Sequence, residues 1–66
     1  MARANIEKIE SNSRHKFYCV TLEQGAYQAR VTVMLRLNAS EAEVHKECQK
    51  RITGLRQTIK KMETAQ

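Results

Sequence analysis

The sequence predicts an α+β fold in which an antiparallel β-hairpin, residues 16–37, packs on one long C-terminal amphipathic helix, residues 40–63. Two observations lead to this prediction. Residues 16–37 are rich in β-branched and aromatic side chains and alternate between apolar and polar positions, which is typical of half-buried strands. Residues 44–62 instead place apolar side chains every three or four positions, which is typical of a helix with one apolar side.

The second strand of the hairpin has one apolar and one mixed side. Counted at every second residue, the apolar side is Tyr27, Ala29, Val31, Val33, Leu35 and Leu37. The other side is Gln28, Arg30, Thr32, Met34 and Arg36. Successive side chains of a strand point to opposite faces, so we expect the first set to face the helix and the second to lie on an open face.

Gly25 is the turn signal inside the hairpin. A two-residue loop at residues 24–25, or a four-residue loop over 23–26, sets Leu22 opposite Tyr27 and Val20 opposite Ala29. A three-residue loop would split the apolar residues between the two faces, which disfavours it. We therefore expect the register in which the apolar residues share one face.

The helix has its own start signal. Asn38 or Ser40 can cap the helix, and Ser40 with Glu43 forms the S-x-x-E pattern of a capping box. The apolar stripe that follows is Val44, Cys48, Ile52, Leu55, Ile59 and Met62. Gly54 interrupts an otherwise good helical sequence, and two interpretations stay open, a close packing contact or a slightly weakened helix.

Residues 1–15 are the hardest to interpret, because Ile6 and Ile9 fit neither strict alternation nor a long helical stripe. Residues 11–13, Ser-Asn-Ser, are typical of a turn. A short edge strand, which would make the sheet three-stranded, and an irregular N-terminal arm are the two alternatives, and the strand is the one we expect.

We expect residues 1–66 to form a single small domain. A domain of this size buries little apolar surface, and a narrow sheet with open edges is usually paired or covered. We therefore expect a homodimer that pairs edge to edge or helix to helix.

The sequence contains few residue patterns that are typical of catalytic or metal-binding sites. The chain contains no Asp and only two Gly, so neither an Asp-based metal site nor a glycine-rich phosphate loop can form. His15 with Cys19 and His45 with Cys48 invite a zinc interpretation, but residues 15 and 19 of an extended strand lie about 13 Å apart. We expect no enzymatic activity, no metal, no cofactor and no disulfide between the two cysteines.

Two isolated cysteines and the absence of a long apolar run favour a cytoplasmic protein without a membrane partner. The formal net charge of +5 and the isoelectric point near 9.6 permit binding to nucleic acid or to an acidic protein surface. Arginines on the outward side of a β-ribbon can reach phosphates and base edges.

We therefore expect a small basic binding protein that contacts nucleic acid as an accessory or regulatory factor. The candidate binding residues are Arg14, Lys16, Phe17, Arg30, Thr32, Met34 and Arg36. The alternative is a protein-protein interaction module or small inhibitor that covers a partner's surface through a patch around Phe17 and Met34, or through an open strand edge.

Overall fold

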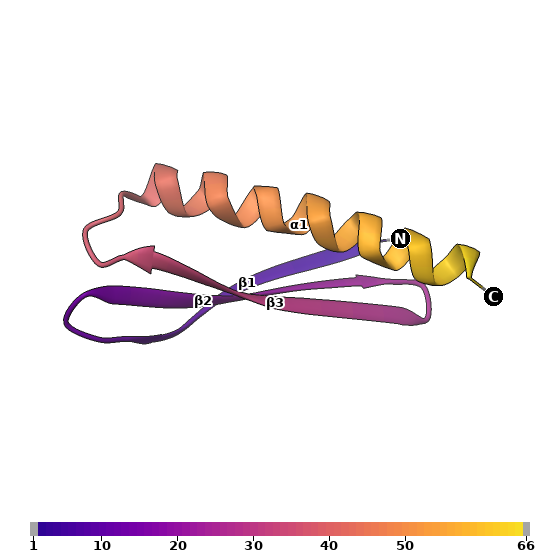
Figure 1. The fold of residues 1–66 in the computed structure, drawn as a ribbon, viewed down its shortest axis with the longest axis horizontal. Helices are drawn as coiled ribbons and strands as arrows, with labels where there is room; N and C mark the ends of the chain where they lie inside the picture. Colours follow the sequence, from indigo (N-terminus) through magenta and orange to yellow (C-terminus); the bar gives the residue numbers. More distant parts are fainter. Residues whose placement is uncertain (1, 66) are drawn as a thin grey trace.

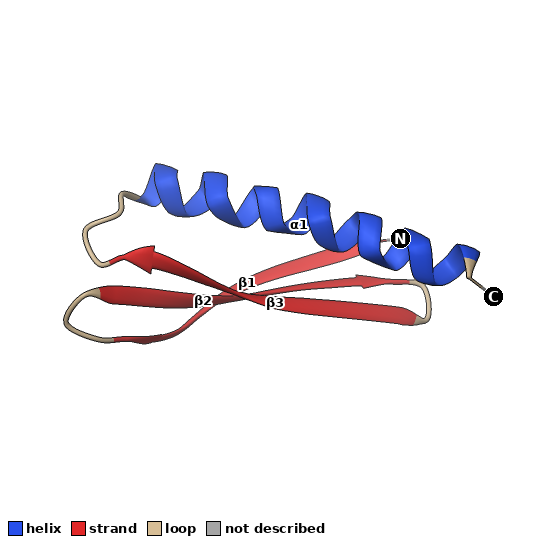
Figure 2. Ribbon diagram, in the orientation of Figure 1, coloured by secondary structure: helices blue, strands red, loops and turns tan. Residues whose placement is uncertain are grey.

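The computed structural model describes residues 2–65. Three strands, β1 (Ala2–Ser11), β2 (His15–Gln24) and β3 (Tyr27–Arg36), are followed by one helix, α1 (Glu41–Thr64). The strands form an antiparallel sheet in the order β1-β2-β3 (Figure 2). The predicted α+β class is confirmed, and so is the three-stranded form of the sheet.

The molecule is an elongated pair of layers, 44 × 18 × 17 Å. α1 lies lengthwise along one face of the sheet (Figure 1), and it packs mainly against β2 and β3. In the described part of the chain, the opposite face of the sheet therefore has no helix over it. We call this the open face.

The core lies between α1 and the β2–β3 hairpin, as the two apolar patterns predict. Its buried side chains are Val20, Leu22, Val33, Cys48, Ile52, Leu55 and Ile59. Val20, Leu22, Cys48 and Ile59 have no exposed surface at all. Half-buried residues, including Tyr18, Val31 and Val44, pack around this centre.

β1 is longer than expected, ten residues instead of a short strand. It pairs regularly with β2 from Ala2 to Lys8, and the register then shifts between Lys8 and Glu10. Ile9 has no partner in β2 at this irregularity. Such an extra residue changes the side to which the following side chains point, which explains why Ile6 and Ile9 break simple alternation.

The β2–β3 register differs by two residues from the one expected. Gln24 lies opposite Tyr27, so Leu22 pairs with Ala29 and Val20 pairs with Val31. The loop is therefore residues 25–26, and Gly25 is its first residue with φ of +61°. Two-residue hairpin loops favour glycine at positions that require positive φ. A shift of two keeps every side chain on its expected face, so the predicted faces are correct although the predicted partners are wrong.

The helix begins at the predicted cap. The Oγ atom of Ser40 accepts a hydrogen bond from the backbone N–H of Glu43, 3.2 Å away. Gly54 lies in the helix with nothing within 4 Å of the place where a Cβ atom would stand. The close-contact interpretation of Gly54 is therefore wrong, and the glycine only weakens the helix.

Candidate functional site

The open face is built from alternate residues of all three strands. Cross-strand pairing arranges them in rows, and the neighbours within a row lie directly opposite one another. The rows are Arg3–Glu23–Gln28, Asn5–Thr21–Arg30, Glu7–Cys19–Thr32, Glu10–Phe17–Met34 and His15–Arg36. The face therefore has two ends of different chemistry, one polar and one apolar.

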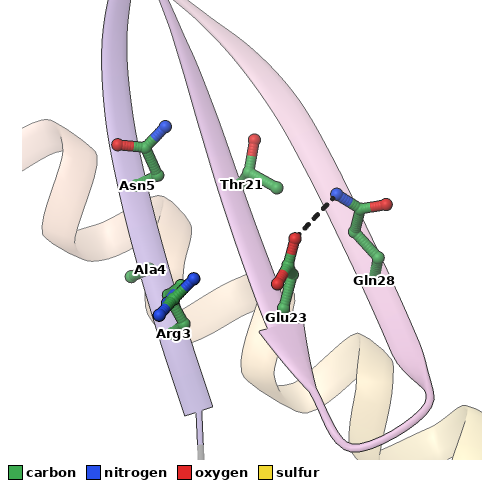
Figure 3. A pocket seen from close by; sticks show the side chains of 6 residues that line it. All are labelled: Arg3, Ala4, Asn5, Thr21, Glu23 and Gln28. Atoms are coloured by element: carbon green, nitrogen blue, oxygen red, sulfur yellow. Dashed lines mark hydrogen bonds between the residues drawn. The ribbon is translucent and has the colours of Figure 1, made fainter.

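The polar end consists of the first two rows, next to the β2–β3 turn. A shallow hollow opens here on the side away from α1, and its lining residues are Arg3, Ala4, Asn5, Thr21, Glu23 and Gln28 (Figure 3). The Nε2 atom of Gln28 donates to Oε1 of Glu23 at 3.4 Å. Amide, hydroxyl and guanidinium groups from three strands thus lie side by side on one surface.

The three arginines of the open face are not used by the fold. Among residues 2–65, the guanidinium groups of Arg3, Arg30 and Arg36 form no hydrogen bond and no ion pair. All three residues are exposed. Their charged groups are therefore available to a partner.

The apolar end lies near the other end of the hairpin. Phe17 of β2 is directly opposite Met34 of β3, and Met34 is 61% exposed. Cys19 adjoins this pair on β2, and its Sγ lies 3.8 Å from Oγ1 of Thr21. The predicted cluster of Phe17 with Met34 is thus present as a cross-strand pair.

The structure brings together five of the seven candidate residues from the sequence. The five on the open face are Phe17, Arg30, Thr32, Met34 and Arg36. Arg14 is exposed in the β1–β2 turn, where its carbonyl oxygen accepts from the N–H of Leu37 at 3.0 Å.

Lys16 does not belong to the open face. It alternates with Phe17 and therefore points to the side of the sheet that carries α1. Its Nζ atom donates to the carbonyl oxygen of Ala39 at 2.8 Å in a partly buried contact. This hydrogen bond holds the segment before α1 against β2, so Lys16 contributes to the fold.

Sequence reasoning missed the contribution of β1. Arg3 and Asn5 lie on the polar end of the open face, and Gln28 completes it from β3. The alternation of residues 2–8 was the available signal, but Ile9 obscured it.

The charge of the open face is balanced. Its rows hold three arginines and three glutamates, Glu7, Glu10 and Glu23. The excess of positive charge lies elsewhere, including on α1, where residues 50–61 contain five Lys or Arg and no Glu. The open face is thus suited to directional hydrogen bonding rather than to attraction by net charge.

The two cysteines are separated by the sheet. Cys48 is fully buried on the side of α1 that faces the sheet, whereas Cys19 is half-buried on the open face, and both thiols are free. Burial raises the pKa of the Cys48 thiol, and the nearby Glu47 carboxylate raises this pKa further. Within residues 2–65, no three His, Cys, Asp or Glu side chains come together in a way that could hold a metal ion.

In the part of the chain that the structure describes, the one helix is not apolar enough to cross a membrane. Comparison of the chain with protein-family models, with curated proteins and with solved structures finds no match.

Proposed function

We propose that this chain is a small, non-enzymatic nucleic-acid-binding protein whose binding surface is the open face of the sheet. The observation that supports this proposal is the polar end of that face. Arg3, Asn5 and Arg30 lie there in two adjacent rows, with Thr21 and Gln28 beside them.

These side chains are the types that recognise base edges and phosphates. Arginine forms two hydrogen bonds to guanine, asparagine and glutamine do the same to adenine, and threonine contacts either phosphate oxygens or bases. The net charge of +5 supplies the general attraction to a polyanion. The face itself, with its balanced charge, supplies contacts that depend on geometry.

The proposal is tested with Arg30→Ala/Arg36→Ala, which removes two exposed guanidinium groups from β3. Stability should change by no more than about 0.5 kcal/mol, because neither side chain contributes to the core. Affinity for nucleic acid should fall at least about tenfold, and the salt dependence should flatten by roughly one unit for each phosphate that the variant no longer neutralises. Fluorescence anisotropy against short single-stranded and double-stranded DNA and RNA at two salt concentrations measures both effects.

The matched control is Lys60→Ala/Lys61→Ala, which lowers the net charge by the same amount from exposed positions on α1. This variant should lose much less affinity than the arginine variant. Equal losses would mean that only net charge matters and would overturn the assignment to the open face. A wild-type protein that binds none of the four probes at low salt would overturn the function itself.

A second candidate function rests on the apolar end of the open face. The Phe17–Met34 pair leaves Met34 61% exposed, and exposed apolar side chains near arginines are typical of protein-protein interfaces. The chain would then act as an interaction module or inhibitor that covers a partner's surface. Binding through such a patch persists at high salt, whereas binding to phosphates weakens steeply.

A further inference from the structure

β1 is the least covered element of the molecule. Within residues 2–65, it pairs with β2 along one edge and has no strand along the other. All ten of its residues are exposed, because α1 packs mainly on β2 and β3. The side chains that β1 turns toward the helix layer are therefore only partly covered, and Ile6 among them is 37% exposed.

The free edge of β1 carries charged side chains but keeps a regular backbone over most of its length. Natural edge strands are usually short, charged, interrupted by proline, or bent by a bulge. The chain contains no proline, and the only irregularity of β1 comes late, between Lys8 and Glu10. Residues 2–8 thus offer seven consecutive regular positions.

The sequence of this edge is complementary to itself. When two copies of β1 run antiparallel about a two-fold axis at Asn5, Arg3 of each copy lies opposite Glu7 of the other. On the helix side of the sheet, Ala4 of each copy lies opposite Ile6 of the other. One register therefore forms two opposite-charge pairs and two apolar pairs, and both kinds stabilise antiparallel strands.

Neighbouring registers do not keep this match. Centred on Ile6, the pairing sets Arg3 opposite Ile9 and forms no charge pair. Centred on Glu7, it places two carboxylates opposite each other, which is destabilising. A shift of one residue sets Arg3 opposite Lys8, which brings like charges together. The register centred on Asn5 is therefore favoured by its charge pairs as well as by its apolar pairs.

We propose that a second copy of this chain occupies the free edge of β1, in the register centred on Asn5. The two three-stranded sheets then form one sheet of six strands, with both helices on the same side and both open faces on the other. The Ala4–Ile6 pairs lie along the junction, between the two helices, where the cover that each α1 gives is incomplete. The inference rests on β1 alone and does not depend on binding to nucleic acid.

The test exchanges the two charges. Sedimentation velocity over a range of concentrations should show a dimer for the wild type. Glu7→Arg should weaken the association at least about tenfold, because each pair then holds two cations. Adding Arg3→Glu to the same chain should restore the dimer.

Mixing provides a stricter version of the test. Arg3→Glu and Glu7→Arg should each be largely monomeric alone, yet an equimolar mixture should form heterodimers, because every facing pair can then be formed without like charges. Since Arg3 also lies opposite Glu23 of its own chain, circular dichroism must show that each variant is folded. Arg36→Glu, on the other edge strand, is the matched control and should leave the dimer intact.

A monomeric wild type at all concentrations would overturn the proposal. A dimer that survives Glu7→Arg would overturn the β1 register, and so would an Arg36→Glu variant that dissociates. None of these outcomes depends on the nucleic-acid measurement, so the two proposals can fail separately.

Discussion

Cys19 and Cys48 differ in exposure, because Cys19 is half-buried and Cys48 is fully buried. Cys48 has no exposed surface, and burial followed by the charge of Glu47 raises the pKa of its thiol. Because the thiolate is the reactive form, we expect the Cys19→Ser variant, which keeps Cys48, to react slowly with a thiol reagent until denaturant is added. The Cys48→Ala variant, which keeps the half-buried Cys19, should react quickly.

The raised pKa of the Cys48 thiol makes the stability of the fold depend on pH in one direction. A thiol whose pKa is raised in the folded state holds its proton more tightly there than in the unfolded chain. The resulting stabilisation is present below the unfolded-state pKa and is lost as the pH rises through the folded-state pKa. Labelling of Cys48 should therefore accelerate at alkaline pH, as its thiol ionises and the folded state loses this stabilisation. Equal labelling rates for both thiols at neutral pH would mean that α1 does not pack on the sheet.

The alternation of side chains along β3 predicts which of its residues lie on the open face. Arg30, Thr32, Met34 and Arg36 were placed on the open face from their spacing alone, because a strand that buries one side fixes the other. Lys16 alternates with Phe17 and by the same rule lies on the side of the sheet that carries α1. The binding roles of these residues stay predictions, because side-chain type and exposure do not identify a partner.

At the scale of elements, the two glycines of the chain should respond with opposite signs to the same substitution. Gly25→Ala should destabilise the protein by about 1–2 kcal/mol, because Gly25 has φ of +61° and a Cβ atom is unfavourable in the left-handed region. Gly54→Ala should stabilise it by up to about 1 kcal/mol, because the new methyl group meets nothing within 4 Å and alanine is the better helix former. Urea denaturation of both variants measures the two changes, and changes of the same sign would contradict either the turn or the helix.

The elements differ in how completely the sequence defines them. The helix could be predicted with its cap because its stripe and the Ser40–Glu43 pattern agree. The hairpin faces could be predicted, but the partners could not, since any register shifted by two keeps the apolar residues together. The register is set by the turn, because Gly25 adopts a positive φ as the first loop residue. The hydrophobic pattern carries no information about this backbone conformation. β1 was the least predictable element because an unpaired residue inside it breaks its alternation.

At the scale of the whole molecule, stability should be distributed unevenly. The core joins α1 to β2 and β3, and β1 adds no fully buried side chain. Opening β1 in a single chain therefore exposes little additional apolar surface, and segments of this kind open at low free energy. In the proposed dimer, by contrast, β1 becomes a central strand with hydrogen bonds on both edges.

Hydrogen exchange of the backbone amides, measured by NMR at two protein concentrations, tests both the opening of β1 in a single chain and its protection in the dimer. In dilute solution, where single chains predominate, amides of β1 should exchange faster than amides of β2, β3 and the middle of α1. As the concentration rises, protection of β1 should increase, because ligation by a second copy stabilises the state that it binds. Amides that exchange only by global unfolding should gain protection in every element. The β3 amides that point to its free edge should stay unprotected and serve as the internal control, because that edge remains in solvent. Protection that rises in β3 instead of β1 would place the contact between copies on the opposite edge of the sheet, and the pairing of Arg3 with Glu7 would then be wrong.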